Sequence, residues 1–299
     1  WLPELGLRLD LQLDALSLLF ALLVTGLGVL VTVYSLAYMR GEPGLGRYYG
    51  LLLVFMVAML GVVTAGNLLL LFIFWELTSV SSFLLIGFRH EEEASQQSAL
   101  QALLVTGGGG LALLAGVVLL GQVYGTYDLS AILAQPGLLR GHPSYGWVLG
   151  LVLAGACAKS AQFPLHFWLP NAMVAPTPIS AYLHSATMVK AGLYLLARLA
   201  PVLGGTPSWH MTLLAVGGLT MLMGAAQALR QRDLKAILAY TTISSLGMFV
   251  TLLGIGTAAA VEAALVLLPA HALYKGCLLY TSDAADDLLC VDLGGRRII

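Results

Sequence analysis

The chain has 299 residues, of which 59% are hydrophobic and only 10% are charged, and its mean hydropathy is +0.89. Soluble domains carry about 25% charged residues, so this composition predicts an all-α polytopic membrane protein. The formal net charge of −1 gives no basic surface for nucleic acid. Three cysteines without CxxC spacing or a neighbouring histidine cluster predict no metal site and no cofactor.

A membrane-spanning helix needs about 20 apolar residues, and on that scale nine spans are predicted. Residues 1–14 precede them as an extramembrane segment, in which leucines alternate with polar residues from Leu7 to Leu13 and predict a short hairpin strand. The second and third spans are separated by residues 65–67 alone, which predicts a tight helical hairpin. The spans cover residues 15–39, 49–65, 68–88, 100–122, 147–166, 181–199, 209–229, 234–255 and 259–280.

The positions of the arginines predict the orientation of these spans. By the positive-inside rule, the side with more positive loop charges faces the cytoplasm. That side holds five loop arginines and the opposite side holds three; the two sets are Arg40, Arg47, Arg89, Arg230 and Arg232, and Arg8, Arg140 and Arg198.

Two other runs of residues have a structural interpretation. The four glycines at 107–110 lie in an apolar segment, where small residues let helices approach closely, and no GK[ST] follows them as in a phosphate-binding loop. The three glutamates at 91–93 belong to a polar loop, which predicts a solvated turn and no metal site.

A carboxylate and an amine, Glu76 and Lys159, lie inside two separate apolar spans. A charge at the centre of a bilayer costs about 2.5–3.5 kcal/mol on insertion scales, so the two are expected to face protein or water and to form a functional pair. Glu76 would hold Lys159 protonated, and loss of contact would release the proton. The alternatives are a Glu76 bonded within the bundle and a Lys159 that reaches the membrane surface.

Proline and histidine residues extend this pattern. Pro164 follows Lys159 by five residues and predicts a broken helix, which at membrane depth usually lines a wet cavity. His184 and Lys190 follow in the next span, where a regular helix would place Lys190 about two turns beyond His184 and would put His184 and Thr187 on one face. His184 is either a proton relay to Lys190 or an ordinary core residue.

Three further titratable residues lie in the last two spans. His271 and Lys275 are four residues apart and are expected on one helix face. Lys235 stands beside Asp233 at the start of a span, where it is either a loop charge or a channel residue. Together the seven residues predict lateral proton transfer across several helices.

Three segments of the sequence resemble a known family. FWELTSVSSFLLIG at 74–87, AKSAQFPLHFWLPNAM at 158–173 and APTPISAYLHSATMVKAG at 175–192 are similar to the proton-antiporter core shared by complex I, in its subunit 5/L, and Mrp-type cation/proton antiporters. Within that family, WELTS, FPLHFWLPNAM and Lys190 resemble the large A-type polypeptide of Mrp-type Na+/H+ antiporters.

The resemblance implies a helical bundle with two inverted five-helix repeats, each with a broken helix. It assigns Glu76 as the carboxylate of the pair and Lys159 as the channel lysine. It places His184 and Lys190 on the connecting segment, and Lys235, His271 and Lys275 on the second half-channel and its link.

The resemblance covers residues 15–276 as the membrane core. The family continues after HALYKG with further apolar spans, whereas residues 277–299 begin CLLYTSDAADD, which resembles a translated sequencing adapter. We therefore expect a truncated chain with a non-native tail at 277–299, and two spans missing before residue 1.

These observations predict a subunit of a multisubunit Na+/H+ antiporter, with no redox cofactor, in the inner cell membrane. Its partners would be other membrane subunits, protons, Na+ and the lipid bilayer. The alternative is a proton-pumping membrane subunit of NADH-quinone oxidoreductase or of a membrane-bound hydrogenase, which would make it part of an enzyme. A helical scaffold whose charges only guide assembly is a third interpretation.

Overall fold

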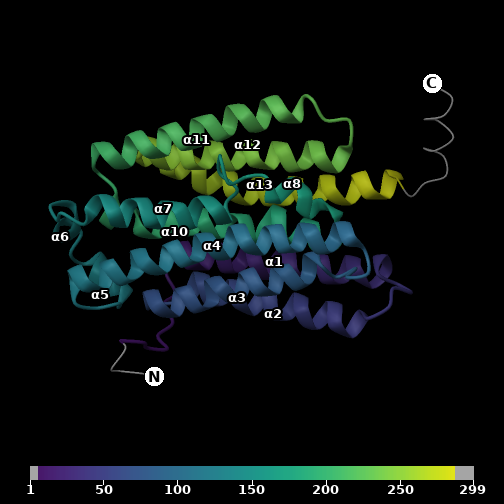
Figure 1. Ribbon diagram of the computed structural model, residues 1–299, viewed down its shortest axis with the longest axis horizontal. Helices are drawn as coiled ribbons and strands as arrows, with labels where there is room; N and C mark the ends of the chain where they lie inside the picture. The colour runs from purple at the N-terminus through teal and green to yellow at the C-terminus, as the bar shows by residue number, and fades with distance from the viewer. Residues whose placement is uncertain (1–5, 287–299) are drawn as a thin grey trace.

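The computed structural model describes residues 6–286 as a bundle of roughly parallel and antiparallel helices (Figure 1). Within these residues, eight helical segments are long and apolar enough to cross a membrane, and α7 is a shorter apolar helix. The predicted all-α membrane bundle is therefore confirmed. The elements are α1 Ala15–Tyr38, α2 Leu45–Thr64, α3 Leu68–Ile86, α4 Glu93–Tyr124, α5 Leu129–Leu133, α6 Gly137–Arg140, α7 Tyr145–Lys159, α8 Trp168–Asn171, η2 Ala172–Val174, α9 Thr177–Ala181, η3 Tyr182–Ala186, α10 Met188–Leu203, α11 Pro207–Ala228, α12 Leu234–Ile255 and α13 Ala258–Asp286.

Side-chain caps define where several of these helices begin. Asp14 and Ser17 form a capping box at the start of α1. Asn67 caps α3, and Asp233 caps α12, in each case by accepting hydrogen bonds from backbone N–H groups of the first turn. The short loop between α2 and α3 confirms the predicted helical hairpin.

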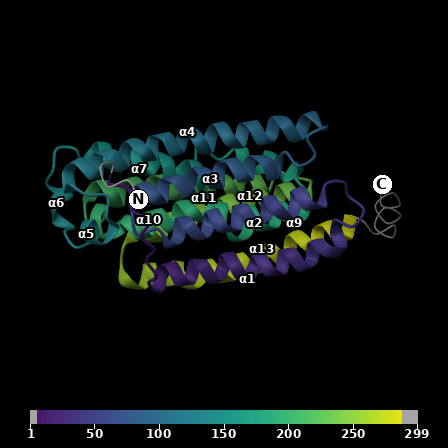
Figure 2. The same cartoon turned by 90° about the horizontal axis from the view of Figure 1, so that it is seen from below.

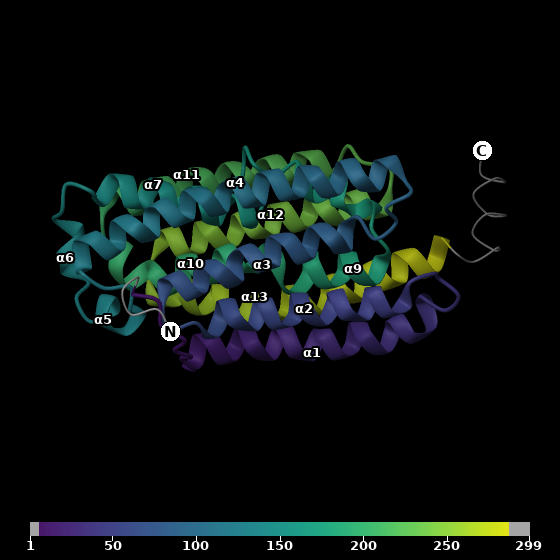
Figure 3. The same cartoon turned by 60° about the horizontal axis from the view of Figure 1, so that its bottom comes forward.

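The helices pack as antiparallel neighbours around a continuous apolar core. α11 lies along α12, α4 lies along α7, and α2 lies along α3. Seen from below, α1 and α13 lie side by side along one edge of the bundle, and α4 lies along the opposite edge (Figure 2). The short helices α5 and α6 lie together at one end, away from the α1–α2 turn (Figure 3).

The predicted strand at residues 7–13 is wrong. Within the described residues this segment forms no strand and makes only isolated bridges, such as the one that joins Leu11 to Ala65. Leu9, Leu11 and Leu13 are more than half exposed, so their alternation does not mark a buried face. Apolar side chains at a membrane boundary need no protein core to cover them, which removes the basis of the prediction.

The predicted fifth span, residues 147–166, is shorter than expected because its helix ends early. α7 stops at Lys159, and residues 160–167 form turns before α8. This break confirms the effect expected of Pro164, which cannot donate the hydrogen bond that would continue the helix.

The predicted sixth span is not one regular helix. α9 passes into the π-helical turn η3, and α10 begins only after Thr187, whose φ of −126° and ψ of −85° are not helical. The shared face expected for His184 and Thr187 assumed a regular helix, which this interruption replaces, so it stays a prediction. Single π-helical turns are frequent at functional sites.

The expected boundary of a non-native tail at residue 277 coincides with no break in the helix. α13 continues through Cys277 and ends at Asp286, and residues 287–299 lie outside the described part of the chain. The assignment of residues 277–299 to an adapter stays a prediction.

Candidate proton path

Lys159 is the last residue of α7, and its side chain is fully buried against α3. The ammonium group Nζ donates hydrogen bonds to the carbonyl oxygen of Trp75, at 3.0 Å, and to Oγ of Ser79, at 2.7 Å. It also lies 5.3 Å from the centre of the Trp75 ring. The lysine does not reach the membrane surface, so its ammonium is held by polar groups of α3 inside the bundle.

Glu76 lies next to Trp75 on α3 but makes no ion pair with Lys159. In the described structure no oxygen of Glu76 lies within 4 Å of Lys159 Nζ, although the two side chains interact electrostatically. The Glu76 oxygen Oε1 is buried and has no hydrogen-bond partner among the described residues. The pair predicted from the sequence is thus brought together, with its two charges separated.

The glycine run on α4 makes room for this carboxylate. A Cβ atom on Gly110 would overlap Oε1 of Glu76 and lie 2.8 Å from its Cδ. A Cβ atom on Gly109 would overlap the Cβ of Ala158 on α7. The close helix approach expected of residues 107–110 is confirmed, and it occurs on both sides of the Glu76–Lys159 region.

A tryptophan binds a backbone carbonyl that the helix break after Lys159 leaves without its helical donor. Trp168 on α8 donates its indole N–H to the carbonyl of Ala158, at 2.9 Å, in place of the backbone N–H that a continuing helix would supply. Its ring centre lies 6.0 Å from that of His184 on η3. Trp168 therefore contacts both the end of the lysine helix and the predicted relay histidine.

His184 and Lys190 are both buried but have different surroundings. Neither ring nitrogen of His184 has a hydrogen-bond partner among the described residues. Lys190 is fully buried and donates from Nζ to the carbonyl of Leu268 on α13, at 3.1 Å. The connecting segment predicted from the sequence thus reaches α13 through Lys190.

His271 lies between two lysines on the α13 side of the bundle. Its ring nitrogens have no hydrogen-bond partner in the described structure, and Lys190 and Lys275 both act on it electrostatically. Lys275 donates to the carbonyl of Leu238 at 3.2 Å and to the hydroxyl of Thr241, both on α12. These contacts join α10, α13 and α12 through three titratable side chains.

Lys235 lies apart from this buried series. It is half-buried at the first turn of α12 and lines an open pocket of about 310 Å3 together with Asp233, Ser98 and Asn171. Leu238, which accepts the hydrogen bond of Lys275, follows three residues later. The structure therefore places Lys235 at the end of a helix and one turn from the Lys275 contact.

An ion pair elsewhere, between a buried arginine and a half-exposed aspartate, was not predicted. The sequence pattern placed Arg198 among the loop charges, but this residue lies in α10, is 5% exposed and pairs with Asp14 at the start of α1. The Arg198 guanidinium holds the pKa of the Asp14 carboxyl well below its usual range. Its position within an apolar span is the signal that the loop assignment overlooked.

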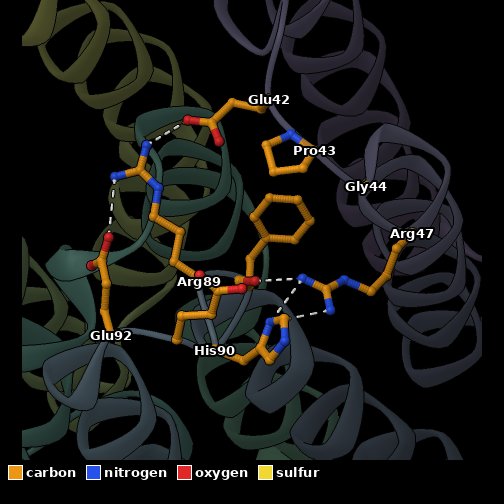
Figure 4. Close-up of a pocket in the computed structure, with 9 residues that line it drawn as sticks. Glu42, Pro43, Gly44, Arg47, Arg89, His90 and Glu92 are labelled. Carbon is orange, nitrogen blue, oxygen red and sulfur yellow. Dashed lines mark hydrogen bonds and ion pairs between the residues drawn. The ribbon is translucent and has the colours of Figure 1, made fainter.

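The first turn of α2, which holds Arg47, and the loop that holds Arg89 form a charged pocket of about 530 Å3 (Figure 4). Arg89 pairs with Glu42 at 2.7 Å, and this hydrogen bond raises the pKa of Arg89. Arg47 donates to the carbonyl of Phe88 at 2.5 Å. No cluster that could hold a metal ion occurs among the described residues. This pocket contains none of the seven predicted site residues.

The chain belongs to the transmembrane family described as NADH:quinone oxidoreductase/Mrp antiporter, whose model matches residues 65–286. Residues 1–49 match the model described as NADH-ubiquinone oxidoreductase (complex I), chain 5 N-terminus. The resemblance seen in the sequence is thereby confirmed.

Two relatives are named as antiporter subunits. The chain is 50% identical over 286 residues to the A/B-type subunit of a probable K(+)/H(+) antiporter of Rhizobium meliloti, with 96% of this chain and 29% of the relative covered. It is 45% identical over 299 residues to the A1-type subunit of a Na(+)/H(+) antiporter of Staphylococcus aureus, with 96% and 37% covered. The chain thus spans about a third of the length of these relatives.

A solved structure has the same fold. The structure of the Mrp complex from Dietzia sp. DQ12-45-1b contains a chain that superposes with a TM-score of 0.90 at 44% identity. The match covers 93% of this chain and 31% of that one.

Proposed function

We propose that this chain is part of a membrane subunit of a multisubunit monovalent cation/proton antiporter. The observation that carries the proposal is the series of buried titratable side chains on α7, η3, α10 and α13, beside the half-buried Glu76 on α3. Four or more such groups inside a membrane bundle are costly to keep for packing alone. The names of the relatives, which are Na(+)/H(+) and K(+)/H(+) antiporter subunits, support the same function.

In this proposal, protons move laterally between the buried groups. Glu76 modulates the charge of Lys159, the channel lysine, and His184 with Lys190 connects this region to the α13 side. His271 and Lys275 continue the path toward α12. Lys235, at the first turn of α12, exchanges protons near the end of the path. Because the consecutive groups are not joined by direct hydrogen bonds in the described structure, transfer between them requires side-chain movement or intervening water.

The proposal also covers the type of transporter, its partner subunits, its membrane and its ions. The subunit is a secondary transporter without its own cofactor, and it works with other membrane subunits in the inner cell membrane. Protons and Na+ are the proposed ions. Because one relative is named for K+ and another for Na+, exchange of both cations should be measured.

The test is cation/proton exchange in inverted vesicles that carry the full-length gene and its operon. Lys159→Ala and Glu76→Ala are compared with wild type at matched expression, and Glu91→Ala in an exposed loop is the charge-removal control. We expect cation-driven pH change to be lost in both site variants and retained in the control. Exchange retained in both site variants would refute the proposed path and favour a scaffold.

The second candidate is a proton-pumping membrane subunit of a redox-driven complex. The family description, which joins NADH:quinone oxidoreductase and Mrp antiporters, is the observation that favours it. In that case electron transfer in other subunits drives the same protonation changes. Neighbouring genes for redox subunits, and exchange that depends on an electron donor, would select this alternative.

A further inference from the structure

We propose that Ser79 is a positioning residue that provides Lys159 with a second binding position, separate from Glu76. The second position, here called the hydroxyl site, consists of the Ser79 hydroxyl and the Trp75 carbonyl. This inference rests on the proposed function, because it assigns a step to the Lys159 ammonium of the proton path.

The described geometry places Lys159 in the hydroxyl site. Its Nζ lies 2.7 Å from Ser79 Oγ and 3.0 Å from the Trp75 carbonyl oxygen, and both Lys159 and Ser79 are fully buried. An ammonium group has three donors, so two of them are used here. Glu76, which would attract the same ammonium more strongly, has its Oε1 buried without a hydrogen-bond partner among the described residues.

The two positions lie on neighbouring parts of one helix. Trp75 and Ser79 are four residues apart and therefore share a face of α3, and Glu76 lies between them in sequence. The lysine side chain is a flexible four-carbon stem, so rotamer changes can move its ammonium between the hydroxyl site and Glu76.

The hydroxyls on α3 differ in their contact with Lys159, since each of them, Ser79 included, also donates to a carbonyl of α3. Thr78 donates to the Trp75 carbonyl, Ser81 donates to the Leu77 carbonyl at 2.6 Å, and Ser82 donates to the Ser79 carbonyl at 2.9 Å. All three bonds remain within α3. Among these four hydroxyl groups, Ser79 is the one that receives a hydrogen bond from Lys159.

The chemistry of a hydroxyl suits a lysine that must release its proton. A carboxylate only accepts hydrogen bonds when ionised, so it favours the ammonium form of Lys159. A hydroxyl can accept from an ammonium or donate to a neutral amine. The hydroxyl site can therefore accept from Lys159 before proton release and donate to its amine afterwards, whereas an ionised Glu76 can only accept and favours the protonated form.

The other charged groups on the helices packed against α7 do not compete with Glu76 and Ser79 for the Lys159 ammonium. Glu76 on α3 is the charge that acts on Lys159. On α10, which packs against α7, Lys190 is bound to Leu268 and Arg198 to Asp14. The other helix packed on α7 is α4, whose acidic residue Glu93 lies exposed at its first turn.

The experiment compares Ser79→Ala, Ser79→Cys and Ser79→Thr in the complete antiporter, with exchange measured against pH. Ser81→Ala is the matched control, since this buried hydroxyl on the same helix bonds only to its own backbone. Ser79→Cys keeps most of the volume but has a weak acceptor, so it covers the case in which the alanine variant fails to fold.

We expect Ser79→Ala and Ser79→Cys to lower maximal exchange and to move half-maximal exchange about one unit to higher pH, because Lys159 is left with the carboxylate alone. Ser79→Thr should restore the wild-type profile, and Ser81→Ala should not alter it. Wild-type rate and profile in Ser79→Ala or Ser79→Cys would overturn the inference. Lys159→Ala, measured in parallel, separates the two failures: retained exchange there refutes the proposed function, whereas its loss beside a normal Ser79 variant refutes the hydroxyl site alone.

Discussion

Gly110→Ala is expected to impair exchange by displacing Glu76, with little loss of protein stability. The new Cβ would overlap Oε1 of Glu76 and lie 2.8 Å from Cδ, which must retreat to at least 3.4 Å for an ordinary contact. The carboxylate is the end of a flexible side chain, so it can turn away at a cost of about 0.5–1.5 kcal/mol. A displacement of about 1 Å in a reacting group can cost about 100-fold in rate.

Two neighbouring glycines make this prediction specific. Gly108→Ala meets nothing within 4 Å and should leave exchange and stability unchanged. Gly109→Ala overlaps Ala158 and approaches the backbone carbonyl of Ala154 at 3.4 Å, so it should push α4 from α7 and destabilise by about 1–3 kcal/mol.

The assay is exchange in inverted vesicles together with thermal stability of the purified complex for all three variants. We predict a loss of exchange of about 10- to 100-fold in Gly110→Ala with a nearly normal melting temperature, since misplaced reacting groups produce losses of this size. Normal exchange in Gly110→Ala, or equal damage by Gly108→Ala, would refute the role given to the Glu76 position.

Two further predictions concern the ion pair and the second half of the path. Asp14→Asn should destabilise the protein by about 1–2 kcal/mol at neutral pH, since it leaves the buried Arg198 without its partner. The low pKa of Asp14 means that this stabilisation is complete above about pH 4 and is lost as pH falls below it. The melting temperatures of wild type and Asp14→Asn should therefore converge in acid. Asp10→Asn, at an exposed position, is the control. Lys190→Met should abolish exchange, whereas Lys235→Met, at a half-buried site, should leave a substantial fraction; the same vesicle assay checks both, and the reverse order would contradict the path.

Much of the fold could be predicted from the sequence because membrane spans are set by length and hydropathy. The α2–α3 hairpin and the break after Lys159 followed from a short loop and from Pro164. The π-helical turn at Tyr182–Ala186 could not be predicted, since its residues are compatible with a regular helix. The strand at residues 7–13 was wrong because alternation was taken to mean burial by protein.

The candidate site was predicted as a set of residues but not as a set of contacts. Charges in apolar spans identify Glu76 and Lys159, yet only packing decides that Lys159 binds Ser79 in place of Glu76. Arg198 was counted as a loop charge because the predicted span ended at residue 199, only one residue later. α10 in fact continues to Leu203 and encloses Arg198. The roles of all seven residues remain predictions.

The central claim is that Glu76 and Lys159 act as one unit in a proton path, and a double-mutant cycle tests it most directly. Initial exchange rates are measured for Glu76→Gln, Lys159→Met and the double variant in the complete antiporter. If the two residues act together, the double variant loses no more than Lys159→Met alone. Losses that multiply in the double variant, or exchange that survives Lys159→Met, would contradict the claim.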